Sequence, residues 1–216
     1  MKRTKEVNMK FDIKKTIGYH ATKKPQIFER PGYRCLCIDG AGDPNGSDFS
    51  INIQAMYACA YGLKMGYKKS GINAQAYDDY VVPPLQGYWT ISEAAQQRGT
   101  WTKADLVYRL EIVIPDFVPD AFIHETLEAT QSAKADIARI NQVYLGAIAP
   151  ANVCHILHVG PYDEEQASFD QMQAYLDAQG AMRTSQNHRE IYLSDARRTA
   201  PEKLKTILEV TITEES

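Results

Sequence analysis

The sequence predicts an α+β fold made of two similar halves that pack around a central cleft. The main observation is that one order of elements, strand–helix–strand–strand, occurs twice along the 216 residues. Each such unit forms a small antiparallel sheet with a helix on one face, and a unit of that size buries little apolar surface alone. Hydrophobic residues make up 44% of the chain, which permits a core once the halves join. The seam between the halves is a favourable place for a ligand pocket.

The first half spans about residues 31–118. Its helix is predicted from apolar residues such as Phe49, Ile53 and Met56, which recur at helical spacing. A turn-rich segment separates this helix from the strand before it. The predicted elements are a strand at 33–38, a helix at 48–65, a strand at 77–90 that Pro83-Pro84 interrupts, and a strand at 106–114.

The second half spans about residues 151–213 and repeats this order. Its helix has Phe169 and Met172 on one face and ends at Gly180, a residue suited to a helix C-terminus. The predicted elements are a strand at 153–159, a helix at 165–179, a strand at 188–193 and a strand at 205–212. An insert between the halves, about residues 119–150, is expected to hold a helix and then a strand-like or helical piece. A lid over the cleft is one role open to this insert.

The charge of the chain gives no reason to expect nucleic acid as a partner. The 24 Lys and Arg residues are balanced by 27 Asp and Glu residues, for a net charge of −3. Residues 1–30 carry nine of the basic residues and three of the acidic ones, and we interpret this start as a solvated, partly frayed terminus. No apolar run approaches the roughly 18 residues that span a bilayer, and the N-terminus lacks a secretory signal. We therefore expect a cytoplasmic protein with no membrane partner; the sequence does not indicate its oligomeric state.

The four cysteines are predicted to be buried free thiols. Cys35 and Cys37 lie two residues apart on a strand and so share a face. No pair of cysteines has the CxxC spacing of a zinc site. The sequence offers no site for a metal or a nucleotide, so we expect no cofactor.

One strand of the second half places an acid between two rings. Because strand side chains alternate, His188, Glu190 and Tyr192 share one face. Ile191 and Leu193 lie on the other face, which belongs to a core. A carboxylate between two rings suits the wall of a cavity for a flat or cationic organic molecule, although an ordinary solvated strand face has the same pattern.

Several stretches of the sequence are together similar to one known family, and they run through almost the whole chain. They are Gly40-Ala41-Gly42-Asp43-Pro44-Asn45, Pro84-Leu85-Gln86-Gly87-Tyr88-Trp89, Leu106-Val107-Tyr108, Pro115-Asp116-Phe117-Val118, residues 158–165 and, the longest and most specific, residues 188–206. On these residues the chain resembles the GyrI-like small-molecule-binding family, whose fold has two strand–helix–strand–strand (SHS2) units. The family includes effector-binding domains of multidrug-responsive regulators, a gyrase-inhibiting protein and stand-alone proteins. Some stand-alone members resemble hydrolases that open the cyclopropane of DNA-alkylating natural products.

The resemblance implies roles for individual side chains. Glu190 matches the acid that such pockets direct at cationic or polarised ligands. Trp89 and Tyr108 match pocket aromatic residues of the first half, and each could equally be a core residue. Tyr192 and His188 lie on the Glu190 face, where His188 could also simply form a hydrogen bond across the sheet.

Three further polar groups receive structural interpretations. Gln86 stands where similar sequences often have Glu, which removes a candidate second acid and weakens a catalytic role. Arg109 and Glu111 share a strand face and are expected to form a surface ion pair worth little. The acids at 163–165 are explained by the dipole of the helix that they begin.

The first functional hypothesis is binding of lipophilic, planar or cationic small molecules, with Glu190 opposite the ligand charge. The second is a cofactor-independent hydrolase of electrophilic, strained-ring molecules, with Glu190 as general base on water or as acid toward a leaving carbonyl. The third, inhibition of a protein partner such as a topoisomerase, ranks last because no docking surface is evident. The thirty residues before the first predicted strand show no helix–turn–helix pattern, so we expect no DNA-binding domain.

Overall fold

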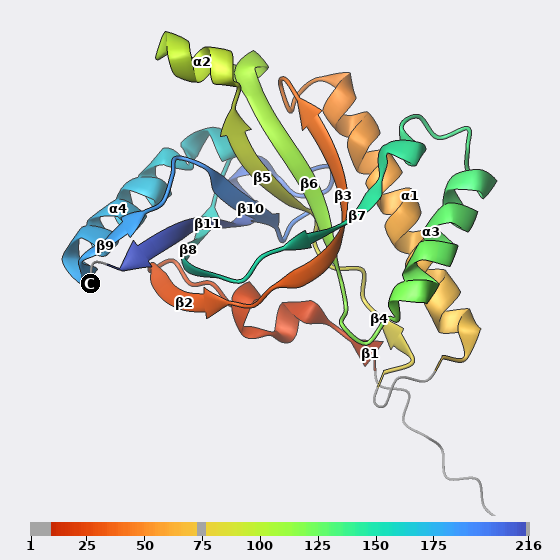
Figure 1. Cartoon of the computed structure of the whole chain (residues 1–216). Coiled ribbons are helices and arrows are strands. Elements are labelled where there is room, and N and C mark those ends of the chain that lie inside the picture. Colours follow the sequence, from red (N-terminus) through yellow and green to blue (C-terminus); the bar gives the residue numbers. More distant parts are fainter. Residues whose placement is uncertain (1–9, 73–76, 215–216) are drawn as a thin grey trace, which may run out of the picture.

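A computed structural model describes residues 10–72 and 77–214. It confirms the predicted α+β class: nine strands form one curled antiparallel sheet, and helices pack against it (Figure 1). The order strand–helix–strand–strand occurs twice. The first set is β3 (Tyr33–Ala41), α1 (Ser47–Ser70), β5 (Gln86–Ile91) and β6 (Leu106–Ile114), and the second is β8 (Ala151–Val159), α4 (Gln166–Gln179), β10 (His188–Tyr192) and β11 (Lys205–Glu214).

The two sets of strands join edge to edge in this sheet. Its order is β2-β8-β11-β10-β5-β6-β3-β7. The order is symmetric about its centre, because β8, β11 and β10 of the second set mirror the corresponding strands β3, β6 and β5 of the first set. The middle of the order is the antiparallel pair β5–β10, in which Gly87 lies opposite Glu190. The sequence predicted a separate small sheet in each half. In two separate sheets, β5 and β10 would each be an edge strand with unpaired backbone groups. Their pairing removes both edges and joins the strands into one continuous sheet.

Two strands outside the repeated sets cross from one half to the other. β2 (Gln26–Arg30) leads into β3 but pairs with β8. β7 (Tyr144–Ile148) leads into β8 but pairs with β3. The connection between β2 and β3 lies against the connection between β7 and β8, because a Cβ on Gly32 would be 3.2 Å from a side-chain carbon of Pro150. The strand that precedes each repeated set therefore pairs with the other set.

The segment before β3 is more structured than predicted. It contains β1 (Lys10–Phe11), two 3-10 turns and β2, and the side chains of Ile13 and Tyr19 are buried. They pack in an apolar cluster with Ile191 and Ile207 on the inner face of the curled sheet. The expectation of a frayed terminus is wrong for residues 10–30, because the many charges there surround apolar residues that fill this face. Residues 1–9 lie outside the described part of the chain.

The predicted strand at 77–90 is two strands with different partners. β4 (Asp79–Tyr80) pairs in parallel with β1, whereas β5 belongs to the large sheet. The break falls at Pro83-Pro84, where prolines cannot donate to a ladder. The remaining short elements are α2 (Glu93–Arg98), β9 (Ala181–Arg183) and 3-10 turns at Ile13–Lys15, Ile17–Tyr19, Lys103–Asp105, Ile140–Gln142, Tyr162–Glu164 and Pro201–Lys203.

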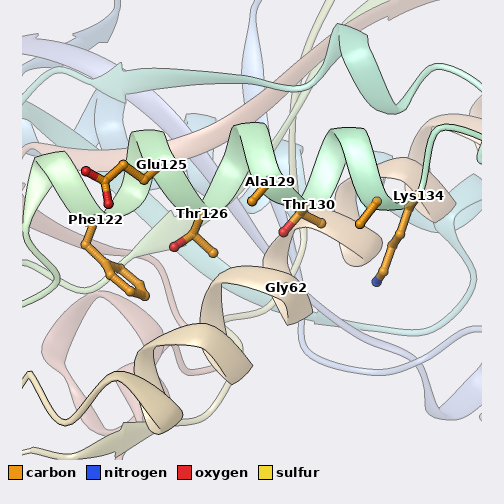
Figure 2. Close-up of a pocket in the computed structure, with 8 residues that line it drawn as sticks. Gly62, Phe122, Glu125, Thr126, Ala129, Thr130 and Lys134 are labelled. Atoms are coloured by element: carbon orange, nitrogen blue, oxygen red, sulfur yellow. The ribbon is translucent and has the colours of Figure 1, made fainter.

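The insert helix is α3 (Asp120–Ala133), and it packs along α1 (Figure 2). A glycine makes the close approach possible, because a Cβ on Gly62 would lie 2.5 Å from the hydroxyl oxygen of Thr130. A hollow of about 420 Å³ remains between the two helices. No residue of the insert borders the larger cavity described below, so the suggested lid role is wrong. The division of the chain into a first half at about 31–118, an insert at about 119–150 and a second half at about 151–213 remains a prediction.

Helices α1 and α4 cover the outer face of the sheet. Buried Leu36 and Leu110 pack beneath α1, and Ile156 and Leu208 pack with α4. All four cysteines are buried free thiols, as predicted. No helix in the described ranges combines the length and the apolar character needed to cross a membrane.

A buried ion network lies on the inner face at the seam. The fully buried Glu111 accepts hydrogen bonds from Arg189 and, at 2.8 Å, from Arg109. Arg189 Nε also lies 3.5 Å from an oxygen of Glu209, which Arg30 approaches to 2.9 Å. The expectation that Glu111 belongs to a surface ion pair is therefore wrong. The strand alternation placed it correctly with Arg109, but the sequence could not show that the inner face is closed to solvent.

Candidate functional site

A cavity of about 1900 Å³ lies over the seam, between α1 and α4. Drug-sized ligands usually occupy pockets of about 300–1,000 Å³, so this cavity can hold a large polycyclic molecule. Both halves supply its wall. Its lining includes Phe49, Ile53, Tyr57, Trp89 and Trp101 from the first half, and Tyr162, Glu165, Phe169, His188, Glu190 and Tyr192 from the second.

Glu190 is the centre of a hydrogen-bonded group in this wall. Its side chain shares a strand face with His188 and Tyr192, as the alternation predicts, and the residue is 9% exposed. His188 Nε2 lies 3.0 Å from Glu190 Oε1. The Tyr192 hydroxyl is hydrogen-bonded with Glu190 and accepts a hydrogen bond of 3.0 Å from Trp89 Nε1. Burial raises the pKa of Tyr192 well above 10, so that its hydroxyl keeps its proton.

A glycine opposite Glu190 allows this arrangement. A Cβ on Gly87 would lie 2.5 Å from Trp89 Nε1 and 2.9 Å from the Tyr192 hydroxyl oxygen. Any larger residue there would push apart the two groups that meet above the strand. The side chains of Trp89 and Tyr192 therefore come together from two halves because position 87 has no side chain.

Tyr108 lies behind the wall and does not line the cavity. It is 2% exposed and packs against Trp89 and Phe49, with ring centroids 5.1 Å away in both cases. Asn52 Nδ2 donates a hydrogen bond of 3.2 Å to its hydroxyl. Of the five residues that the sequence singled out, the structure brings four to the cavity, and Tyr108 supports Trp89 from the core.

Glu165 is a second acid in the cavity, and sequence reasoning missed it. The residue is 7% exposed, directly precedes α4, and its Oε1 has no hydrogen-bond partner in the described part of the chain. Burial, and then the negative charges of Glu190 and Asp163, raise its pKa to about 9. The helix-dipole interpretation is therefore wrong for Glu165, because burial dominates. A signal was present: Phe169 lies four residues later, so helical spacing puts both side chains on the cavity side.

Gln86 has no part in this site. It lies on the opposite face of β5, where its Nε2 donates a hydrogen bond of 2.7 Å to the Tyr19 hydroxyl. Arg189 Nη1 lies 3.4 Å from its Oε1. The expectation that Gln86 removes an acid from the site is wrong, because strand alternation directs this position to the inner face.

The mouth of the cavity carries paired charges, in contrast to its interior. Lys103 Nζ of the first half lies 2.6 Å from Asp163 Oδ1 of the second, and both side chains are exposed. Arg197, which is exposed, and Asp195, which is half-buried, form another pair at 2.9 Å. Among the described residues, no Lys or Arg forms an ion pair with Glu190 or Glu165. The two acids without a Lys or Arg partner, Glu190 and Glu165, thus line the cavity together with the aromatic wall.

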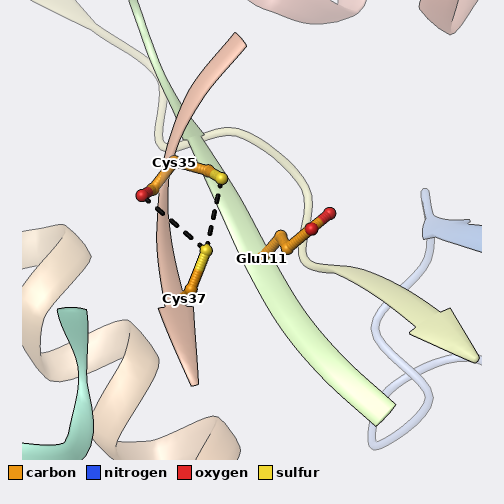
Figure 3. A group of neighbouring side chains, drawn as sticks. All are labelled: Cys35, Cys37 and Glu111. Carbon is orange, nitrogen blue, oxygen red and sulfur yellow. Dashed lines mark hydrogen bonds between the residues drawn. The ribbon is translucent and has the colours of Figure 1, made fainter. Parts of the chain in front are cut away.

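Three potential metal ligands lie together on the inner face, away from this cavity. The ligand atoms of Cys35, Cys37 and Glu111 are within 4.8 Å of one another, and the two sulfur atoms are 3.3 Å apart (Figure 3). The Glu111 carboxylate is already bound by two guanidinium groups. Protein contacts therefore account for the arrangement of this cluster.

Comparisons with known proteins agree with the fold. The model of the family described as GyrI-like small molecule binding domain matches residues 126–212. An uncharacterized conserved protein from Listeria innocua is 32% identical, with a TM-score of 0.80 over 94% of this chain and 100% of that chain. A second Listeria innocua structure, described as a hydrolase, is 30% identical, with a TM-score of 0.79 over 94% and 100% of the two chains.

More distant similarity concerns the fold alone. The C-terminal domain of EcmrR is 10% identical and has a TM-score of 0.52 over 89% of this chain and 98% of that domain. No curated protein sequence matches the chain. With full-length relatives above 30% identity and a matching family model, the chain belongs to the GyrI-like family of small-molecule-binding domains.

Proposed function

We propose that the cavity binds flat, lipophilic small molecules, cationic ones most tightly, and that Glu190 is the charged contact. The observation that carries this proposal is a nearly buried carboxylate without a Lys or Arg partner among the described residues, set in an aromatic wall. Desolvating a carboxylate is costly unless an opposite charge pairs with it. A ligand cation supplies that charge, and the aromatic rings that line the cavity attract it further.

The size and polarity of the cavity support a broad ligand class. Its volume of about 1900 Å³ exceeds the need of one compact ligand. Rings from both halves offer flat apolar surface, and His188 and Tyr192 form hydrogen bonds with Glu190 in this wall. Such a wall discriminates by charge and flatness more than by detailed shape.

A titration tests this proposal. Tryptophan fluorescence is followed while a flat monocationic dye, proflavine, or a neutral flat ketone, fluorenone, is added to wild-type protein and to Glu190→Gln. The substitution keeps shape but removes charge, so proflavine affinity should fall about 10-fold or more, while fluorenone affinity is unchanged. The exposed residue Glu128 on α3 provides the control, Glu128→Gln, which should bind both like wild type. Wild-type protein that binds neither compound at high micromolar concentration would refute the proposal.

A second candidate function is hydrolysis of electrophilic small molecules. The observation that favours it is the presence of two carboxyl groups, Glu165 with a raised pKa and Glu190, in one aromatic cavity. Two Listeria innocua structures described as hydrolases, 30% and 31% identical to this chain, also support it. In this reaction Glu190 activates water toward a strained ring, and the aromatic wall holds the substrate flat.

Product analysis by mass spectrometry tests the second candidate. A neutral flat molecule with a cyclopropane conjugated to a carbonyl is incubated with the protein, and addition of one water is followed. Glu190→Gln should slow turnover by roughly 10²–10⁴-fold with little effect on binding. If the wild-type protein binds the compound but does not convert it between pH 4 and pH 10, only the binding function remains.

A further inference from the structure

We propose that Glu165 presents a proton to the ligand, so that the cavity selects flat molecules carrying an acceptor oxygen, such as a carbonyl, beside the part that faces Glu190. The inference rests on the proposed small-molecule site and specifies what that site recognises. It assigns different tasks to the two acids. Glu190 meets a positive or electron-poor atom, and Glu165 donates a hydrogen bond to an oxygen.

The position of Glu165 is the first argument. Its side chain lines the cavity at the start of α4, the residue is 7% exposed, and Oε1 has no hydrogen-bond partner among the described residues. A buried polar atom without a partner costs about 1–3 kcal/mol, and the cost is much larger for a carboxylate than for a neutral carboxyl group, so this position favours the protonated side chain. Phe169, one turn later, lines the cavity as well, so Glu165 lies in an aromatic part of the wall.

The electrostatic surroundings are the second argument. The titratable and charged groups that share the cavity with Glu165 are Lys14, Tyr57, Tyr61, Lys103, Tyr162, Asp163, Arg183, His188, Glu190, Tyr192, Asp195 and Arg197. The negative charges of Glu190 and Asp163 act directly on the Glu165 carboxyl, and Lys103 is held by Asp163. Burial and these acids raise the pKa of Glu165 to about 9, so at neutral pH it carries an O–H that can donate.

For an electrophilic ligand the same contact completes a reaction. Water attacks a carbon of a strained ring that is conjugated to the carbonyl, and Glu190 takes the water proton. The ring carbon–carbon bond breaks, its electron pair moves toward the carbonyl, and the carbonyl oxygen takes the proton of Glu165. One water is added in total, and proton transfer from Glu190 to Glu165 restores the starting state.

A pair of probes separates the hydrogen bond from general apolar binding. Fluorenone and fluorene have the same flat skeleton, but fluorene lacks the carbonyl. Both are titrated into wild-type protein, Glu165→Gln and Glu165→Met. Glu165→Met removes the donor at similar length, so fluorenone affinity should fall about 3- to 10-fold while fluorene affinity stays constant. Glu165→Gln keeps an N–H donor and should retain fluorenone binding.

Two further readouts identify the proton. Wild-type affinity for fluorenone should be constant from pH 6 to pH 8 and should fall above about pH 9, whereas Glu165→Gln shows no such loss. The carbonyl stretch of bound fluorenone should lie at lower frequency in wild-type protein than in Glu165→Met. Unchanged fluorene binding shows that the Met variant is folded.

The outcomes are distinguishable. If fluorene and proflavine bind but Glu165→Met leaves fluorenone affinity and its carbonyl frequency unchanged, the role of Glu165 is refuted while the proposed function stands. If none of the three probes binds wild-type protein, the proposed function itself fails, and this inference fails with it.

Discussion

Glu165 shows how strongly the surroundings of a single side chain can change its chemistry. A helix start stabilises a negative charge, whereas burial and a neighbouring carboxylate oppose it. At Glu165 the second effect is larger, and its pKa is raised to about 9. A sequence pattern reveals the helix start but not the exposure of the side chain, so the sequence indicates only a structural role for this acid.

The shifted pKa of Glu165 predicts a pH-dependent cost in stability. Between the ordinary carboxyl pKa of 4.5 and about 9, the folded protein holds a proton that the unfolded chain has released. The contribution of this group to stability is therefore complete at low pH and declines as pH rises through that window. Glu165→Gln should lack this decline and at pH 8 should exceed the wild type in unfolding free energy by on the order of 2–4 kcal/mol.

Urea unfolding of both proteins at pH 4.5 and pH 8 measures this effect. The difference between variant and wild type should be small at pH 4.5 and large at pH 8. Equal differences at the two pH values would show that Glu165 is ionised in the folded protein, contrary to this account.

The strand alternation predicted which residues share a face of a strand, but it did not predict how deeply those residues are buried. The alternation in β10 correctly grouped His188, Glu190 and Tyr192. The same rule grouped Arg109 with Glu111, but Glu111 is completely buried because the curled sheet and the N-terminal segment close over it. Exposure depends on segments far apart in sequence, so a local pattern cannot supply it.

Among the helices and strands, segments with a regular sequence pattern were predicted well, whereas the strand β2, which pairs with a distant part of the chain, was not. The strand β6 begins and ends at the predicted residues, and the predicted helix stop at Gly180 is a left-handed C-cap with φ of 66°. β2 was missed because its five residues, Gln26–Arg30, carry charges and pair with a distant strand, so neither composition nor a neighbouring hairpin marks it.

The pairing of β5 with β10 predicts a sensitive glycine at the wall of the cavity. Gly87→Ala places a methyl group against Trp89 and Tyr192, so it should separate the indole from the hydroxyl. We expect a loss of about 1–3 kcal/mol in stability, typical of overpacking, and weaker binding of proflavine. Thermal unfolding and fluorescence titration measure the two effects.

Gly18 is the matched control for this substitution. A Cβ on Gly18 has no neighbour nearer than 3.6 Å, so Gly18→Ala should bind proflavine like wild type. Loss of binding in the Gly18 variant, or none in the Gly87 variant, would argue against the role given to position 87.

At the scale of the whole molecule, the two halves are joined by main chain as well as by side chains. The strand before each half pairs with the other half, β5 pairs with β10, and the buried ion network contains Glu111 of the first half and Arg189 of the second. The repeat of element order indicated two units and a seam between them. The exchange of β2 and β7 was not predictable, because it depends on which of several equivalent edges each strand meets.

This architecture predicts a single cooperative unfolding transition. Urea unfolding followed by tryptophan fluorescence, which reports on Trp89 and Trp101 of the first half, should coincide with unfolding followed by far-ultraviolet circular dichroism. Separate midpoints would show that the halves are independent units that merely touch.

The central claim is that the cavity between α1 and α4 is the ligand site and that Glu190 is its charged contact. A crystal structure with a flat, brominated monocationic dye tests it most directly, because the anomalous signal of bromine locates the ligand independently of the protein. One strong peak is expected over the seam, with the dye on the Trp89 wall and its positive end toward Glu190. A peak in the hollow between α1 and α3, or on the outside of the molecule, with this cavity unoccupied, would contradict it.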